Sequence, residues 1–191
     1  SDLHSGTVPR DLRHDAVCGV SDLIMRLDAR WQSRLSAGDD LVVTSGIFQT
    51  DVQEHAVTRI SGHVSFSLEA RSLNSYTLTA FAEEIMATAH QVSEARGVTF
   101  RFDSPVLTEP ATLDHSVFAA LKHSCEALAV NHLELASGAG HDSAIFARQG
   151  IPSGMVFVRN QNGSHNPHEA MEMDDFLLGV GVIQQTLEEW K

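Results

Sequence analysis

Two loop motifs in the last third of the sequence carry residue types that suit a metal hydrolase. Residues 137–142 read SGAGHD, and residues 163–169 read GSHNPHE. In the second motif His165 stands between a serine and an Asn-Pro turn, a setting in which neighbouring groups fix the orientation of a metal-binding imidazole. The alternative is a structural histidine bonded to the backbone. His168 and Glu169 beside it are equally consistent with solvated groups or with groups that support the ligand.

A single imidazole is too few ligands for a hydrolytic metal. Catalytic zinc takes about three protein ligands and keeps an open position for water. Neither an H-E-x-x-H pattern nor paired C-x-x-C occurs in the sequence. The sequence therefore reads as part of an enzyme.

The glycines of the SGAGHD motif stand where a backbone would approach a ligand closely, just before an expected helix. Free N–H groups at such a place attract a carboxylate or a developing oxyanion. The alternative is a tight turn with Asp142 as the helix cap. A dinucleotide site is excluded because the order of residues is wrong and no long apolar strand precedes the motif.

Arg71 could bind a substrate, and a further histidine precedes an expected helix. Arg71 follows the expected strand at residues 64–68, and a guanidinium at a strand end can clamp a carboxylate with two hydrogen bonds. An ion pair with Glu69 or Glu54 is the alternative that the residues alone favour. His4 begins the stretch HSGTVP ahead of an expected helix. A nucleophilic Ser-His-Asp site is not indicated, because no G-x-S-x-G accompanies it.

Composition narrows the classes of partner. The 191 residues have a formal net charge of −12, which argues against nucleic acid or an anionic membrane, since phosphate binding needs clustered Lys and Arg. The longest apolar run, residues 176–183, is far shorter than the roughly 20 residues of a membrane span, and no signal peptide is recognisable. Cys18 and Cys125 lack redox or metal spacing and are expected to be reduced core thiols in a cytoplasmic protein.

The sequence pattern of residues 1–112 predicts the element order strand, helix, strand, strand, helix, strand. Apolar residues at helical spacing predict a helix over 10–35, and Asn74 or Ser75 is expected to cap a second helix that ends at Gly97. β-Branched or alternating residues predict strands at 41–51, 64–68 and 98–102. This order is typical of a ferredoxin-like βαββαβ fold, with a four-stranded antiparallel sheet and both helices on one face.

After prolines at 105 and 110, residues 113–191 are expected to form a helix capped by Asp114, a short helix ending at Gly150, a strand over 153–158 and a closing helix. The closing helix is expected to turn an apolar side inward, formed by Phe176, Val180, Ile183, Leu187 and Trp190. The apolar faces of these helices are expected to pack against a β-sheet, and the chain does not supply one. Because the chain has no initial methionine and starts inside a motif, we expect a fragment or a processed half.

Four motifs together resemble the zinc-dependent hydantoinase/carbamoylase family of amidases, within the aminoacylase-like metallopeptidase superfamily. That family includes N-carbamoyl-L-amino-acid hydrolases, β-ureidopropionases and allantoate amidohydrolases. The motifs are HSGTVP with RHDA at 4–16, FSLEAR at 66–71, SGAGHD at 137–142, and IPSGM at 151–155 leading into SHNPHE at 164–169.

The resemblance implies an α/β zinc hydrolase whose catalytic domain is interrupted by an α+β lid that also forms a homodimer. Residues 1–112 would be the ferredoxin-like lid, and residues 113–191 would be the C-terminal part of the catalytic domain. The N-terminal half would then be missing, with the other metal ligands and the general-base glutamate. No catalytic residue is therefore expected in this chain.

The resemblance also gives roles to individual residues. His165 would be the last metal ligand, Arg71 would clamp the substrate carboxylate, and His4 would reach the active site of the neighbouring subunit. Gly138, Gly140 and His141 would line the pocket. Members usually have an Asn-Val-Ile-Pro-Gly-like stretch where residues 58–62 read TRISG, so Thr58 takes the place of a substrate-contacting asparagine. Val8 and Arg10 also depart from the usual pattern.

The implied reaction is hydrolysis of a carbamoyl or ureido C–N bond by metal-activated water in a small carboxylate substrate. Zinc, manganese or cobalt would serve the full-length enzyme, and the fragment alone is expected not to retain it and to be inactive. The alternative is a non-catalytic dimerisation or ligand-binding module derived from the same family.

Overall fold

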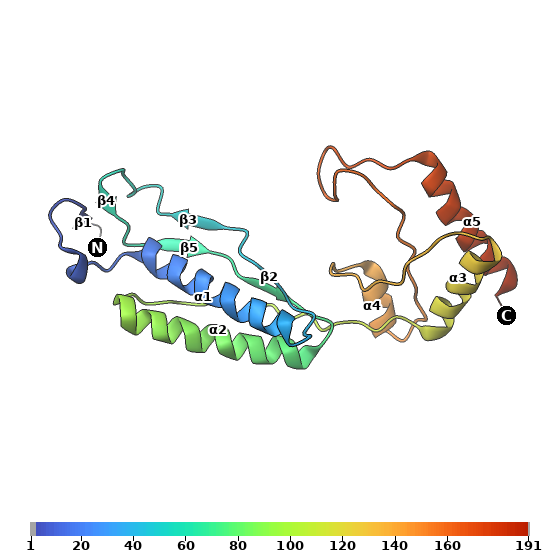
Figure 1. Ribbon diagram of the computed structural model, residues 1–191, viewed down its shortest axis with the longest axis horizontal. Helices are drawn as coiled ribbons and strands as arrows, with labels where there is room; N and C mark the ends of the chain where they lie inside the picture. Colours follow the sequence, from blue (N-terminus) through green and yellow to red (C-terminus); the bar gives the residue numbers. More distant parts are fainter. Residues whose placement is uncertain (1–2, 191) are drawn as a thin grey trace. The chain divides into compact units, whose positions relative to one another are not determined.

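The computed structural model describes residues 3–190 of a chain that divides into two compact units, Ser1–Pro110 and Ala111–Lys191 (Figure 1). The first unit holds the strands β1 (Leu3–His4), β2 (Val42–Thr44), β3 (Phe48–Thr50), β4 (Arg59–Ile60), β5 (Val64–Phe66) and β6 (Glu69–Arg71), a 3-10 turn η1 (Arg10–Leu12), and the helices α1 (Ala16–Ser36) and α2 (Ser75–Arg96). The second holds α3 (His115–Ala127), α4 (Asp142–Arg148) and α5 (Met173–Glu189).

Both long helices of the first unit begin and end at residues that satisfy their free backbone groups. The carboxylate of Asp15 accepts the N–H groups of Val17 and Cys18 at 3.0 and 3.2 Å, so α1 starts there and not at residue 10. The expected earlier start is wrong, and Leu12 is 62% exposed. For α2 the prediction is confirmed, with Asn74 as N-cap and Gly97 in the left-handed region at φ 63°.

The strands of the first unit form three separate antiparallel pairs, β1–β4, β2–β6 and β3–β5. The register changes by one residue between Thr44↔Glu69 and Phe48↔Phe66, so three residues face two and form a bulge. The Ser67 hydroxyl accepts the N–H groups of Gly46 and Ile47 at this point, at 3.1 and 2.9 Å. A continuous four-stranded ferredoxin-like sheet is therefore not confirmed.

The last predicted strand of this unit, over 98–102, forms no ladder in the described part of the chain. Its aromatic side chains nevertheless pack where a strand would place them. The rings of Phe100 and Phe102 each lie 6.2 Å from the ring of Phe66, edge to face. The alternation of apolar residues thus reflects ring packing on Phe66 of β5, which leaves Phe102 38% exposed, and not membership of a sheet.

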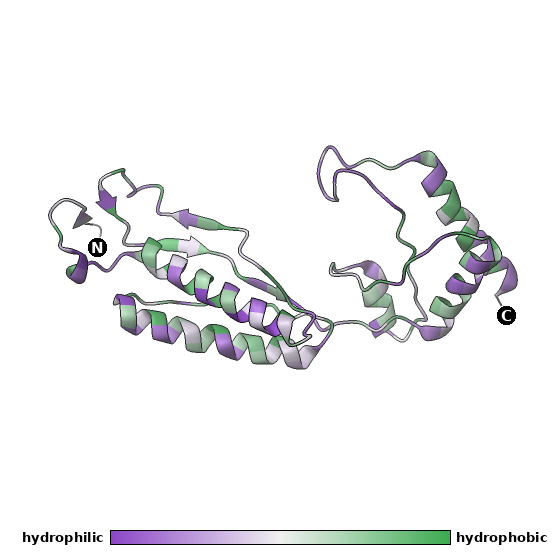
Figure 2. Ribbon diagram, in the orientation of Figure 1, coloured by the Kyte–Doolittle hydropathy of each residue, from purple (hydrophilic) through white to green (hydrophobic). Residues whose placement is uncertain are grey.

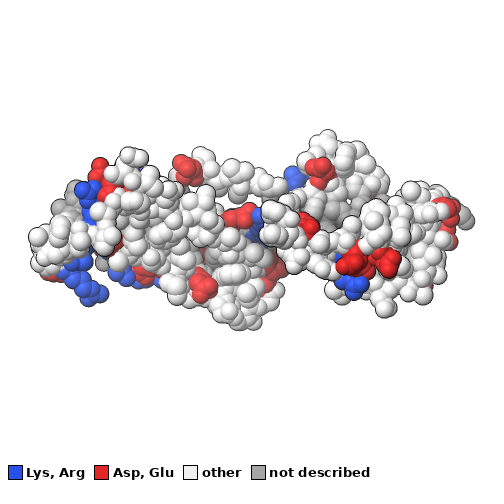
Figure 3. Space-filling model, turned by 90° about the horizontal axis from the view of Figure 1, so that it is seen from above, with Lys and Arg blue, Asp and Glu red and all other residues white. Residues whose placement is uncertain are grey.

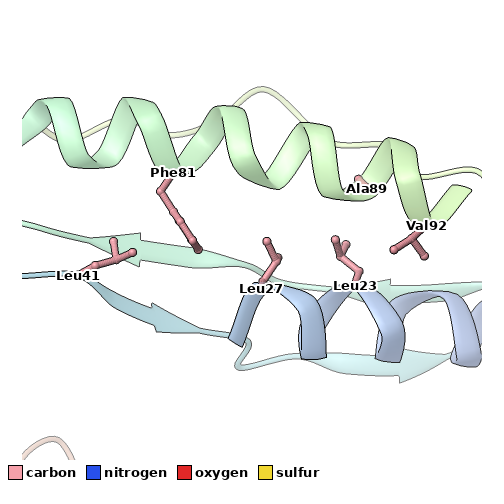
Figure 4. Packing of buried hydrophobic residues seen from close by; sticks show 6 residues of the cluster. All are labelled: Leu23, Leu27, Leu41, Phe81, Ala89 and Val92. Carbon is pink, nitrogen blue, oxygen red and sulfur yellow. The ribbon is translucent and has the colours of Figure 1, made fainter. Parts of the chain in front are cut away.

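The core of the first unit lies where α1 and α2 pack against each other and against the strands (Figure 4). The spacing of apolar residues predicted this face, since α2 buries Phe81 and Val92 completely and partly buries Leu78 and Ile85. The fully or nearly fully buried members are Leu23, Leu27, Leu41, Phe81, Ala89 and Val92. This packing supports the pairs β2–β6 and β3–β5, here called the β-ribbon, and with them Arg71 at the end of β6.

In the second unit an extended segment passes between helices without forming a strand. Residues 153–158 have no ladder partner among the described residues, so the expected strand is not formed. Glycines permit close packing on both sides, since a Cβ added at Gly154 would lie 2.6 Å from Val117 of α3 and one added at Gly179 of α5 would lie 2.9 Å from Val158. The segment is held by its neighbouring helices.

Helix α5 turns a different face inward from the one expected. Val182 and Thr186 are buried at 2% and 6% exposure against α3. The residues expected to be buried are 41–69% exposed: Phe176, Val180, Ile183, Leu187 and Trp190. Hydrophobic segments, coloured green, lie along α5 in Figure 2. The smaller residues Val182 and Thr186 of α5 pack against α3, and the larger apolar residues of α5 are exposed to solvent. None of the described helices has both the length and the apolar composition of a membrane span.

Candidate functional site

The structure brings two of the predicted substrate residues, His4 and Thr58, to one corner of the first unit. The strand pair β1–β4 sets His4 opposite Arg59, and the Ser5 N–H donates to the Thr58 carbonyl at 2.8 Å. The Gly6 N–H donates to His4 Nδ1 at 3.1 Å. Because a backbone N–H only donates, Nδ1 is an acceptor and the ring hydrogen of neutral His4 is on Nε2. Both side chains are exposed.

Arg71 lies at the end of β6 and forms the ion pair that the sequence left open. Its Nη2 lies 2.8 Å from Glu69 Oε1, while Glu54 pairs with Arg59 at 2.5 Å. The side chains of Arg71 and Glu69 are 45% and 53% exposed. Exposed pairs of this kind contribute about 0–1 kcal/mol. The pair with Glu69 is therefore weak enough to be exchanged for another carboxylate.

The SGAGHD loop is organised by a contact between its serine and its histidine. Ser137 Oγ lies 2.7 Å from His141 Nε2, and the His141 ring meets Phe157 edge to face at 5.6 Å. His141 is the N-cap residue of α4, so Asp142 is not the cap but the first residue of the helix. A Cβ added at Gly138 or Gly140 would meet nothing within 4 Å.

The loop that carries His165 is closed by its own hydrogen bonds. Gln161 and Ala170 exchange backbone bonds at 2.7 and 3.2 Å and close its base. Glu169 accepts the His165 N–H at 2.9 Å and the Asn160 side-chain amide at 3.0 Å. The bond from Asn160, then that from His165, holds the pKa of the Glu169 carboxyl below its usual range.

Backbone strain is concentrated at the same loop. His165 has φ 63° and Asn162 has φ 64°, both in the left-handed region that non-glycine residues seldom adopt. Such conformations persist where surrounding contacts hold them, and they gather at functional sites. The His165 side chain itself is exposed, so a fixed backbone presents an accessible imidazole.

Metal binding by these residues alone is not supported by the donor set. Over residues 3–190, no group of three or more His, Cys, Asp or Glu side chains is placed to hold one ion. His165 can offer one imidazole, whereas a catalytic zinc takes about three protein ligands. The described residues therefore do not complete a metal centre.

The surface charges are of both signs. Acidic and basic groups are interspersed on the face shown in Figure 3.

Two features of the site escaped prediction from the sequence. Ser137 was not singled out, although its spacing of four residues from His141 could have suggested the contact. A groove of about 690 Å³ also lies beside the His4–Thr58 corner, and Arg59 is part of its wall. No sequence signal pointed to the groove, whose other lining residues are Asp15, Val17, Thr50, Asp51, Glu54, His55, Ala56, Val57 and Ser61.

A comparison with protein families accounts for the order of these motifs. Residues 6–189 match the model of Peptidase family M20/M25/M40. The chain belongs to this family. The match covers both units and each of the predicted site residues except His4, which lies two positions before it begins.

Among curated members of the M20 family, the chain is 31% identical over 186 residues to an N-carbamoyl-L-amino-acid amidohydrolase of Pseudomonas sp. (strain NS671), covering 96% of the chain and 44% of that protein. It is 29% identical over 181 residues to the allantoate amidohydrolase of Escherichia coli (strain K12), covering 94% and 43%. The chain thus spans less than half the length of these relatives.

A solved structure gives the same picture of the fold. An amidase of the hydantoinase/carbamoylase family from Burkholderia multivorans superposes with a TM-score of 0.89 over 98% of the chain and 44% of that structure, at 23% sequence identity. At this identity the likeness concerns the fold. The mixed α/β arrangement of this chain therefore matches the fold of part of that amidase.

Proposed function

We propose that the chain is part of an amidohydrolase that cleaves a carbamoyl or ureido C–N bond in an N-carbamoyl amino acid, a ureidopropionate or an allantoate-type substrate. The observation that carries this proposal is the match over residues 6–189 to the M20 family, together with similarity to relatives named for N-carbamoyl amino acids and allantoate. The four loop and strand motifs lie within or beside that match.

In this proposal the first unit is a ferredoxin-like lid, and the second is the C-terminal part of a catalytic domain. The division after Pro110 is consistent with that assignment, since each unit has its own buried residues. The rest of the catalytic domain, with the general-base glutamate, would belong to the part of the relatives that this chain does not cover.

The substrate carboxylate would bind to Arg71. Its present partner, Glu69, is exposed, so a substrate carboxylate can replace it at little cost in free energy. A guanidinium offers two parallel N–H donors to a carboxylate and so fixes both position and orientation. His4 and Thr58 are held together by the strand pair β1–β4. From this corner they would add further contacts to the substrate, with His4 reaching the active site of the neighbouring subunit.

The SGAGHD loop and the His165 loop would supply the catalytic half of the site. Gly138, Gly140 and His141 would line the substrate pocket, and His165 would be one ligand of a divalent metal such as zinc, manganese or cobalt. Because the described donor set does not complete a metal centre, the other ligands would come from the remainder of the enzyme. We expect the chain alone to be inactive.

We further propose a cytoplasmic homodimer that forms through the first unit. The β-ribbon has an exposed outer side, with Val42 at 47% and Phe48 at 44% exposure, and such a surface is suited to self-complementary pairing. The net charge of −12 opposes contact with nucleic acid and with anionic membranes. Light scattering of the chain at micromolar concentration is expected to report a dimer, and a monomer would contradict this assignment.

A second candidate function is a non-catalytic dimerisation or ligand-binding module that keeps the lid. Two points favour it: the family resemblance implies an asparagine where Thr58 stands, and Arg71 is already paired with Glu69. Such a module would bind a small carboxylate without hydrolysing it.

The experiment that separates the two is a hydrolysis assay on the whole protein. It is incubated with N-carbamoyl amino acids, N-carbamoyl-β-alanine and allantoate, and release of ammonia or of the free amino acid is measured. The amidohydrolase proposal predicts turnover of at least one of them. Binding without turnover of any would favour the module.

A further inference from the structure

The contact between Ser137 and His141 determines which nitrogen of the imidazole faces a ligand. Ser137 Oγ lies 2.7 Å from His141 Nε2, and both residues are half-buried. The ring is also held from the side by Phe157, whose centroid lies 5.6 Å away at an interplanar angle of 63°. With Nε2 in contact with Ser137, Nδ1 is the nitrogen left to meet a bound molecule.

The other hydrogen bonds of Ser137 decide where its hydrogen goes. A serine hydroxyl has one donor and two acceptor positions. The Ala139 N–H donates to Ser137 Oγ at 3.2 Å, and Ser137 Oγ donates to the Ala139 carbonyl at 3.2 Å. One acceptor position then remains for His141, so all three contacts are hydrogen bonds at once only when Nε2 carries the ring hydrogen and donates it. In this arrangement every hydrogen-bonding position of the hydroxyl is used.

We propose that Ser137 is a positioning residue that fixes His141 as the Nε2–H tautomer, so that Nδ1 accepts a hydrogen bond from an N–H group of a carbamoyl or ureido substrate. This rests on the proposed function, which places His141 in the substrate pocket. The chemistry fits that class, because the terminal NH₂ of a carbamoyl group is a donor with two hydrogens, and an unprotonated ring nitrogen is an acceptor.

The glycines between the two residues support a ligand at this loop. Neither Gly138 nor Gly140 has a positive φ, and a Cβ at either would meet nothing within 4 Å. The described fold therefore requires glycine at neither position, for conformation or for packing. Small residues there keep a side chain from covering the approach to His141, as expected where a ligand comes close to the backbone.

The first test is nuclear magnetic resonance of the chain itself. Correlation of ring nitrogens with carbon-bound ring hydrogens identifies the tautomer of His141, whose signals are assigned by their loss in His141→Gln. We expect the Nε2–H form in the natural chain and a mixture of tautomers in Ser137→Ala. Ser143→Ala is the matched control, because it removes a hydroxyl that has no hydrogen-bond partner two residues from His141. It should leave the His141 signals unchanged.

Two results would overturn the proposal: an Nδ1–H tautomer in the natural chain, or nitrogen shifts of His141 that are the same in Ser137→Ala. Neither result depends on turnover, so this test is independent of the proposed function.

The second test is kinetic and uses the whole protein with whichever carbamoyl or ureido substrate it hydrolyses. Loss of the one oriented hydrogen bond in Ser137→Ala is expected to lower kcat/KM roughly tenfold. Ser137→Thr, which keeps a hydroxyl, should restore most of it, and Ser143→Ala should match the natural protein. If all three variants behave alike, positioning by Ser137 is wrong although the function stands. If no substrate is hydrolysed, the proposed function fails and the resonance experiment still decides the tautomer.

Discussion

The hydroxyl of Thr186 in α5 lies 2.7 Å from the hydroxyl of Ser124 in α3, and both side chains are buried. Ser124 in turn donates to the Ala120 carbonyl of its own helix at 3.0 Å. This polar contact lies on the face of α5 that packs against α3, and the larger apolar residues of α5 lie outside that face.

Thr186→Val is expected to destabilise the second unit by about 1 kcal/mol, because it keeps the shape but leaves the Ser124 hydroxyl without its donor. Hydrogen–deuterium exchange of peptides from α3 and α5 should become roughly fivefold faster. Adding Ser124→Ala should recover most of the loss, since no buried hydroxyl is then left with an unfilled acceptor position. An additive effect of the two substitutions would contradict this account.

Substitution by alanine is expected to change stability in opposite directions at Gly154 and Gly181. A Cβ at Gly154 would lie 2.6 Å from Val117 and 3.1 Å from Leu121, whereas one at Gly181 would meet nothing within 4 Å. Gly154→Ala should therefore cost about 1–3 kcal/mol through overpacking. Gly181→Ala, inside α5, should stabilise by about 0.5–1 kcal/mol. Thermal melts of the two variants that shift in the same direction would show that the packing of residues 153–158 is misplaced.

Asp22 is expected to make the stability of the first unit depend on pH. It accepts Arg26 Nε and Arg96 Nε, each at 2.8 Å, and these two bonds hold its pKa below the usual 3.8. A carboxyl whose pKa is lowered by folding stabilises the folded state above its unfolded pKa, and this stabilisation is lost as pH falls through the folded pKa. Asp22→Asn should therefore cost about 1 kcal/mol at neutral pH and almost nothing near about pH 2.

Urea unfolding of the first unit at several pH values measures the free-energy cost of Asp22→Asn. The fluorescence of Trp31 reports unfolding, in a protein that also carries Trp190→Phe. Trp31 reports on this unit because its ring N–H donates to the Leu41 carbonyl at 2.6 Å. Asp28→Asn, an exposed position on the same helix, is the charge-matched control. A penalty at Asp22 that does not depend on pH would mean that the two arginines do not stabilise its charge.

The sequence predicted what local chemistry determines. The capped start of α2 at Asn74 and its glycine end at Gly97 are set by neighbouring residues, so their signals were readable. The start of α1 was misplaced because the helical spacing of apolar residues extends back to about residue 10, while Asp15 provides the bonds that begin the helix.

Contacts between distant residues were not predictable in the same way. At the bulge Ser67 meets the backbone of Gly46, about twenty positions away, and α5 meets α3 through the contact of Thr186 with Ser124. At the candidate site, the motifs indicated His141 and His165 because loop residues surround them. The bonds that orient them, from Ser137 and from Glu169, required coordinates.

Metal content gives a further prediction. Over the described residues His165 has no companions that complete a metal centre, so equilibrium dialysis of the chain alone should find much less than one tightly held zinc per chain. Restoring the remainder of the enzyme should raise the zinc content, and His165→Ala in that whole protein should lower it again. One tight zinc bound to the chain alone would contradict the proposed division of ligands.

The central claim is tested most directly by Arg71→Ala in the whole protein, with Arg26→Ala as control. The two arginine side chains are 45% and 43% exposed, and each has a carboxylate partner on its own element. If Arg71 binds the substrate carboxylate, its loss should raise KM for carbamoyl amino acids or allantoate by roughly tenfold or more, with metal content unchanged and Arg26→Ala without effect. An unchanged kcat/KM of Arg71→Ala on every such substrate would contradict the assignment.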